Sequence, residues 1–69
     1  MWEYTRNQCL YAKINDKHCS VWYDIYIHEW RWTTVALTVN RGIVMRKGKC
    51  PTASSAMINA EKDAENVNE

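Results

Sequence analysis

The chain has 69 residues, of which 46% are hydrophobic and 25% charged, and its formal net charge at pH 7 is +1. Its length predicts a single domain over residues 1–69 with a small core, and its composition excludes an intrinsically disordered chain. The charge is unevenly divided, because residues 1–60 carry eight Lys or Arg against four acids, whereas residues 61–69 carry one Lys against four acids. Basic residues concentrate between Arg41 and Lys49, which biases that segment toward an anionic partner.

The amino-terminal residues offer no signal peptide, and no window along the chain approaches a membrane span. Cys9, Cys19 and Cys50 are odd in number and form no Cys-x-x-Cys pair, a pattern that disfavours a disulfide framework. His18 and Cys19 with a second cysteine come nearest to a zinc site, but adjacent residues of a strand point to opposite faces. We therefore expect a cytoplasmic protein that holds no metal or other cofactor.

The first elements in chain order are strands. Residues 2–6 give a weak signal for a short strand, and residues 9–14 give a clearer one with period two. The inward positions of this second strand are Leu10, Ala12 and Ile14. Residues 15–18 contain the turn-forming side chains that end it.

A longer strand is predicted over residues 21–28, which are rich in β-branched and aromatic side chains. Its apolar positions are Val21, Tyr23, Ile25 and Ile27. A three-residue connection at residues 29–31 makes the apolar faces of this strand and the next coincide. The predicted pairs are Ile27 with Thr33, Ile25 with Val35 and Tyr23 with Leu37. A two-residue connection breaks that agreement, and a bulge at residues 33–34 would restore the other register.

Gly42 marks the clearest turn, because glycine can take the positive φ that ends a three-residue hairpin loop with a bulge. The register that follows pairs Val39 with Ile43, Leu37 with Met45 and Val35 with Lys47. One side of the hairpin then carries Val35, Leu37, Val39, Ile43 and Met45. The opposite side carries Trp32, Thr34, Ala36, Thr38, Val44 and Arg46.

After Gly48 the pattern becomes helical and predicts a helix over residues 52–65, with Thr52 as its N-cap and a frayed tail at residues 66–69. Its apolar stripe is Ala53, Ala56, Met57, Ala60, Ala64 and Val67. Ile58 lies outside the stripe and is expected to be exposed. The predicted fold is α+β, with a three- to four-stranded antiparallel sheet within residues 9–47 packed by one carboxy-terminal helix in the order β-β-β-α.

The candidate binding site is the sheet face away from this helix, where aromatic side chains and an arginine gather. Its residues are Trp22, Tyr26, His28, Trp30, Trp32 and Arg46. Large rings on a rigid sheet concentrate binding energy because few rotors are frozen on contact, so we expect a protein partner or a second copy of the chain. The same rings with nearby cations also suit single-stranded nucleic acid. The alternative is that residues 1–14, with Trp2, Tyr4 and Tyr11, cover this face as a second core.

Catalysis has little support in the sequence. Asp24 and His28 share the predicted strand face but are separated by about 13 Å at the rise of a strand, too far for a direct hydrogen bond. The chain contains no nucleophile elbow, phosphate-binding loop or zinc-protease helix. We therefore expect no enzyme activity and no small-molecule substrate.

Two segments resemble known families. Residues 48–56, with Ala60 and Ala64 beyond them, resemble the strand-to-helix junction of double-stranded-RNA-binding domains, but Thr52 to Ser55 stand where that family places phosphate-binding lysines. Residues 30–64 combine Trp-x-Trp, a valine-containing strand, a glycine hairpin and spaced alanines, and resemble small β-hairpin-plus-helix proteins of phages and prophages. That resemblance implies an accessory protein of the host cytoplasm that binds and inhibits or otherwise modulates a host factor, such as a defence or transcription component.

Overall fold

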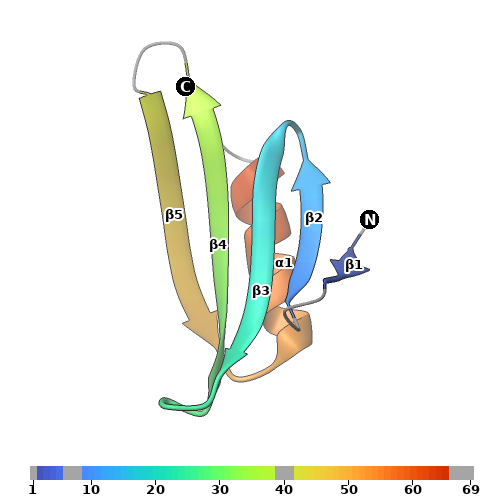
Figure 1. The fold of residues 1–69 in the computed structure, drawn as a ribbon, viewed down its shortest axis with the longest axis vertical. Helices are drawn as coiled ribbons and strands as arrows, with labels where there is room; N and C mark the ends of the chain where they lie inside the picture. The colour runs from blue at the N-terminus through green and yellow to red at the C-terminus, as the bar shows by residue number, and fades with distance from the viewer. Residues whose placement is uncertain (1, 6–8, 39–41, 66–69) are drawn as a thin grey trace.

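The described residues form an antiparallel sheet with a helix packed on one side of it (Figure 1). The structure is a computed structural model, and it describes residues 2–5, 9–38 and 42–65. Five strands lie side by side in chain order. Their bounds are Glu3–Tyr4 for β1, Leu10–Ile14 for β2, Lys17–Asp24 for β3, Glu29–Thr38 for β4 and Gly42–Cys50 for β5, and the helix α1 spans Ala53–Glu65. The predicted α+β class is confirmed.

The sheet has five strands rather than the predicted three or four, and it extends beyond residues 9–47 at both ends. β1 contains Glu3 and Tyr4, which pair with β2 and lie within the weakly predicted strand at residues 2–6. β5 continues to Cys50, since Gly48 and Lys49 still pair with β4. The polar end of β5 therefore belongs to the sheet because of its partner strand and not because of its own composition.

Two short turns set the register of β2, β3 and β4. Asn15 and Asp16 connect β2 to β3 with φ values of 51° and 65°, the left-handed pair that a two-residue hairpin turn requires and that Asn and Asp tolerate. The turn between β3 and β4 spans residues 25–28. His28 (φ 58°) closes it by donating its backbone N–H to the Asp24 carbonyl at 2.8 Å.

This longer turn makes the predicted register between β3 and β4 wrong. The predicted strand over residues 21–28 ends at Asp24, and the predicted loop residues 29–31 belong to β4. A turn with an even number of residues pairs odd positions with even ones, whereas the predicted three-residue turn pairs odd with odd. Val21 accordingly lies opposite Trp32. Ile25, predicted to lie in the core, is in the turn and 64% exposed.

In the hairpin of β4 and β5, the residues predicted to share a side do share one, but the predicted cross-strand pairs are wrong. Leu37 lies opposite Ile43 and Val35 opposite Met45, so the register differs by two residues from the predicted one, and the pairing predicted for residue 39 lies outside the described residues. Because the difference is even, these four side chains still share a face. Gly42 has the predicted positive φ, at 73°.

The helix α1 begins as its sequence predicts. The Thr52 hydroxyl accepts a hydrogen bond from the Ser55 backbone N–H at 3.1 Å, which satisfies one of the amides that a helix leaves unpaired at its first turn. The buried residues of the helix are Ala56, Ala60 and Ala64. Ile58 is 50% exposed, as expected. The residue predicted to end the apolar stripe, Val67, lies outside the described residues.

The core lies between this alanine stripe and the sheet face that carries Trp30 and Trp32, not the face of Val35, Leu37 and Met45 as predicted. Small helix residues leave room for large rings, and the two indoles fill it. Beneath them Cys19 and Val21 are fully buried. The predicted assignment of the two sheet faces was therefore reversed on β4 and β5.

The amino-terminal segment also packs on the helix side of the sheet. Trp2 lies against both clusters of buried residues and donates its indole N–H to the Glu61 carboxylate at 2.7 Å. Tyr4 is 71% exposed, and Tyr11 points to the side of the sheet away from α1, where its ring stacks on His18 at 5.9 Å. The described part of residues 1–14 thus contributes to the main core and does not build a second one.

Candidate functional site

The described residues leave the side of the sheet opposite α1 uncovered, and we call this side the open face. Paired residues of neighbouring strands share a face and alternate along each strand, so the open face follows from the register of the buried positions. Its residues on β2 to β5 are Tyr11, Lys13, His18, Ser20, Trp22, Asp24, Glu29, Arg31, Thr33, Val35, Leu37, Ile43, Met45, Lys47 and Lys49. It is a mixed surface with an apolar end and a polar end.

Apolar side chains gather where β4 and β5 approach their connecting loop, and we call Val35, Leu37, Ile43 and Met45 the apolar patch. The four form two cross-strand pairs. Leu37 is 81% exposed, Ile43 71% and Met45 60%. The pairing of β3 with β4 reaches no further than Val35, so no described strand lies beside Leu37 on that side. The described ends of β4 and β5 therefore extend past β3, and their Leu37 and Ile43 side chains are exposed to solvent.

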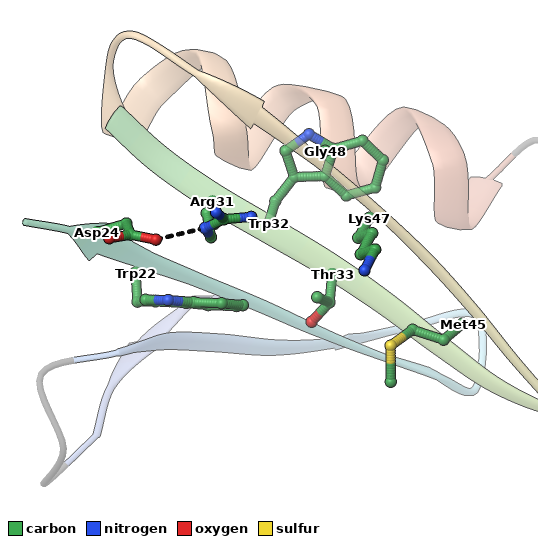
Figure 2. A pocket seen from close by; sticks show the side chains of 8 residues that line it. All are labelled: Trp22, Asp24, Arg31, Trp32, Thr33, Met45, Lys47 and Gly48. Atoms are coloured by element: carbon green, nitrogen blue, oxygen red, sulfur yellow. Dashed lines mark hydrogen bonds and ion pairs between the residues drawn. The ribbon is translucent and has the colours of Figure 1, made fainter. Parts of the chain in front are cut away.

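A hollow of about 540 Å³ lies beside the patch on the same face, between Trp22 and Met45 (Figure 2). Figure 2 shows Trp22, Thr33 and Lys47 extending to one side of the sheet, while the indole of Trp32 lies on the other side, over Gly48. The remaining lining residues are Asp24 and Arg31. The hollow thus offers the Trp22 ring, the Thr33 hydroxyl, the Met45 thioether, the Lys47 ammonium group and the paired charges of Asp24 and Arg31.

A salt bridge fixes one side of the hollow. The Arg31 Nε donates to the Asp24 carboxylate at 2.6 Å. This hydrogen bond, with a further one from the Tyr26 backbone N–H, holds the pKa of Asp24 below its ordinary value. Arg31 is therefore paired with a carboxylate that stays ionised at neutral pH. Among the described residues the exposed cations of the open face without a salt bridge are Lys13, Lys47 and Lys49.

Only one of the six residues predicted to form the binding face lies on the open face, and it is Trp22. Trp30 and Trp32 pack beneath α1. Arg46 is also on the helix side, where its Nη2 lies 3.1 Å from the Asp63 carboxylate. The predicted grouping is wrong for these three residues, because the four-residue turn between β3 and β4 moves the even positions of β4 to the helix side.

The other two predicted residues lie in the turn over residues 25–28. Tyr26 is 89% exposed, and the His28 Nδ1 lies 3.4 Å from the Tyr23 hydroxyl. Neither is part of a strand, so neither is fixed on a sheet face with Trp22. The predicted aromatic face consequently divides among the core, the turn and the open face.

The prediction that the residues of the apolar patch lie in the core is wrong. A sequence signal for the opposite choice existed in the helix, whose stripe consists mainly of alanine and which therefore needs large partners across the interface. Trp30 and Trp32 are the bulkiest residues of β4 and share one parity, whereas Val35 and Leu37 share the other. Matching small helix residues with large sheet residues would have placed the indoles inward.

The Cys19 thiol lies in an environment that lowers its reactivity. Burial raises the pKa of the Cys19 thiol, and the nearby Asp63 and Glu61 carboxylates raise it further, so that the thiol stays protonated and weakly nucleophilic. His18 lies next to Cys19 but on the open face, with its Nδ1 2.5 Å from the Tyr11 hydroxyl. Within the part of the chain that the structure describes, no three His, Cys, Asp or Glu side chains are grouped as metal ligands would be.

Comparison with protein-family models, with curated proteins and with solved structures gives no significant match. Among the described residues, no helix has the length and apolar character needed to cross a membrane.

Proposed function

We propose that the protein is a non-enzymatic binding module that engages another protein through the open face of its sheet. The observation that supports this most strongly is the apolar patch, whose Leu37, Ile43 and Met45 side chains are 60–81% exposed. Single exposed apolar residues are normal on a protein surface, but adjacent cross-strand pairs are typical of an interaction site. The patch belongs to regular strands, so the backbone that carries its side chains is ordered before a partner arrives.

Covering the patch would contribute favourable free energy to binding. Fully burying a Leu, Ile or Met side chain stabilises by roughly 1.5–3 kcal/mol, and the losses of translational and side-chain freedom on association offset part of this gain. Lys47 and Lys49 continue the row that Ile43 and Met45 begin along β5. A partner surface with apolar side chains beside acidic ones would therefore complement both the apolar residues and the lysines of this row.

The resemblance to small phage and prophage proteins supports a particular class of partner. On that basis the protein is an accessory protein of the host cytoplasm, and its partner is a host factor, such as a defence or transcription component, which it inhibits or otherwise modulates.

The test is a comparison of binding by matched surface variants. The tagged full chain is used to isolate binding proteins, and the affinity of a purified candidate is then measured by isothermal titration calorimetry. Leu37→Ser with Ile43→Ser should weaken binding at least 100-fold, whereas Ile58→Ser, which removes an exposed apolar side chain from the outer side of α1, should leave it unchanged. Equal affinities for all variants would refute the open face as the binding surface.

A second candidate function is binding of single-stranded nucleic acid, and the hollow beside Trp22 favours it. A base could stack on this indole while Lys47 and Lys49 contact phosphates, as in proteins that bind unpaired strands on a sheet. Trp fluorescence titrated with single-stranded oligonucleotides at several salt concentrations tests this directly. Affinity that falls steeply with salt and is lost in Trp22→Ala supports the second candidate, and no fluorescence change at low salt excludes it.

A further inference from the structure

The strand β5 forms one edge of the sheet, and no described strand lies beside it on its outer side (Figure 1). It has nine residues and pairs only with β4, whereas β1 at the other edge has two. An edge strand offers a row of backbone N–H and C=O groups to any extended segment that lies alongside it. Soluble proteins usually shorten or cover such an edge. A long uncovered edge therefore either binds a further strand or carries side chains that prevent strand pairing.

The open-face side chains of β5 occur in two blocks along this edge. Ile43 and Met45 are apolar and exposed, and Lys47 and Lys49 follow them as exposed cations. Arg46 points to the helix side and is held by Asp63 of α1, so it is not available to a partner on the open face. The β5 segment contains no acidic residue. The edge therefore presents apolar side chains at one end and positive charge at the other.

A second copy of the chain matches this pattern poorly. In antiparallel pairing of two β5 strands with full overlap, Arg46 lies opposite Arg46 of the copy, Met45 opposite Lys47 and Ile43 opposite Lys49. Cations would thus face cations or apolar side chains throughout. The register that places Ile43 opposite Met45 overlaps only Gly42–Arg46, half of the strand. The lysines act as a barrier to self-pairing while they leave the edge open to an acidic segment.

We propose that β5 takes up an extended segment of the partner protein as a sixth strand, and that this segment carries acidic side chains opposite Lys47 and Lys49 and large apolar side chains opposite Ile43 and Met45. The proposal rests on the protein-binding function inferred above and specifies its partner. In antiparallel pairing the segment reads acid-x-acid-x-apolar-x-apolar from its amino terminus, and in parallel pairing the order is reversed. Backbone hydrogen bonds provide the affinity and the alternate side chains the specificity.

In the experiment, a random library of 12-residue peptides displayed on phage is selected against the immobilised full chain. The enriched peptides are then synthesised, and their affinities for the chain are measured. Enriched peptides should contain the two acids and the two apolar residues at alternate positions. Lys47→Glu should weaken a selected peptide roughly tenfold, as expected when an attractive cross-strand pair becomes repulsive. The matched control Lys62→Glu, an exposed lysine of α1 that changes the net charge equally, should have less than a twofold effect. Replacing the facing acid of the peptide by Lys should restore binding to Lys47→Glu.

The position of the bound peptide distinguishes pairing at the β5 edge from binding elsewhere on the open face. In backbone amide NMR spectra the peptide should shift β5 resonances more than those of β3. Enriched peptides without the alternating pattern, or no rescue by the charge swap, would overturn edge pairing. If such peptides still lost affinity in Leu37→Ser with Ile43→Ser, the open face would stand as the binding surface without the edge. Dimers that compete with peptide in light scattering, or displacement of peptide by single-stranded oligonucleotide, would also overturn the proposal in favour of those occupants.

Discussion

Substituting Gly48 by alanine should destabilise the protein by about 1–3 kcal/mol, the usual effect of adding an atom to a filled space. A Cβ built on Gly48 lies 2.7 Å from the Trp32 Nε1 and 2.8 Å from its Cε2 and Cζ2. Trp32 packs against both clusters of buried residues, so its ring cannot move away without losing contacts under α1. Without this clash the substitution would favour the strand, because glycine is a poor strand residue.

A double-mutant cycle isolates the contact between these two residues. Urea unfolding of the wild type, Gly48→Ala, Trp32→Ala and the double variant is followed by far-ultraviolet circular dichroism, which reports mainly on the backbone. Removing the indole makes room for the new methyl group, so Gly48→Ala should cost nothing in the Trp32→Ala background, and the coupling free energy should be about 1–3 kcal/mol. An equal cost of Gly48→Ala in both backgrounds would show that Trp32 does not lie over Gly48, and the assignment of the two sheet faces would fail with it.

Three further predictions concern other parts of the structure. Arg31 holds the pKa of Asp24 below its ordinary value of 3.8, so the ionised carboxylate contributes stability that is present above pH 3.8 and is lost as the pH falls through the lowered pKa. Arg31→Gln should raise the pKa of Asp24 in an NMR titration of its carboxyl carbon. An unchanged pKa would refute the salt bridge. Trp2→Phe removes the indole N–H that donates to the helix carboxylate and should cost about 1.5–3 kcal/mol in thermal or urea unfolding, so a neutral result would place the amino terminus elsewhere. Val21→Ala, beneath the helix, should destabilise by about 2 kcal/mol, whereas Leu37→Ala on the open face should change stability by less than about 0.5 kcal/mol; the reverse order would contradict the burial pattern.

The elements that the sequence predicts correctly are those with strong local signals. The helix has a threonine cap and an alanine stripe with a helical period, and it begins within one residue of its predicted start. Gly42 predicts its own positive φ because other residues avoid that region. The inward positions of β2 follow from strict alternation, and they lie on the helix side with Ala12 buried.

The candidate site was harder to predict because it depends on the length of one turn. A change from three to four residues between β3 and β4 exchanges the faces of every later residue relative to β3. The residues of that turn, Ile25 to His28, look like strand residues, and only the Asp24 side chain and carbonyl, which accept the Tyr26 and His28 amides, end the strand early. Such capping contacts compete with strand pairing at close range. The period of the apolar residues does not reveal whether the strand continues or the capping contacts of Asp24 end it.

The central claim is that the sheet has one face under the helix and one face free for a protein partner. The most direct measurement is the relaxation of methyl protons by a soluble paramagnetic gadolinium chelate, recorded by NMR with and without the purified partner. The methyl groups of Leu37 and Ile43 should relax strongly in the unbound chain and should be protected by the partner, while those of Val21 should be protected in both states. Strong relaxation at Val21, or protection of Leu37 and Ile43 in dilute monomer, would contradict the account.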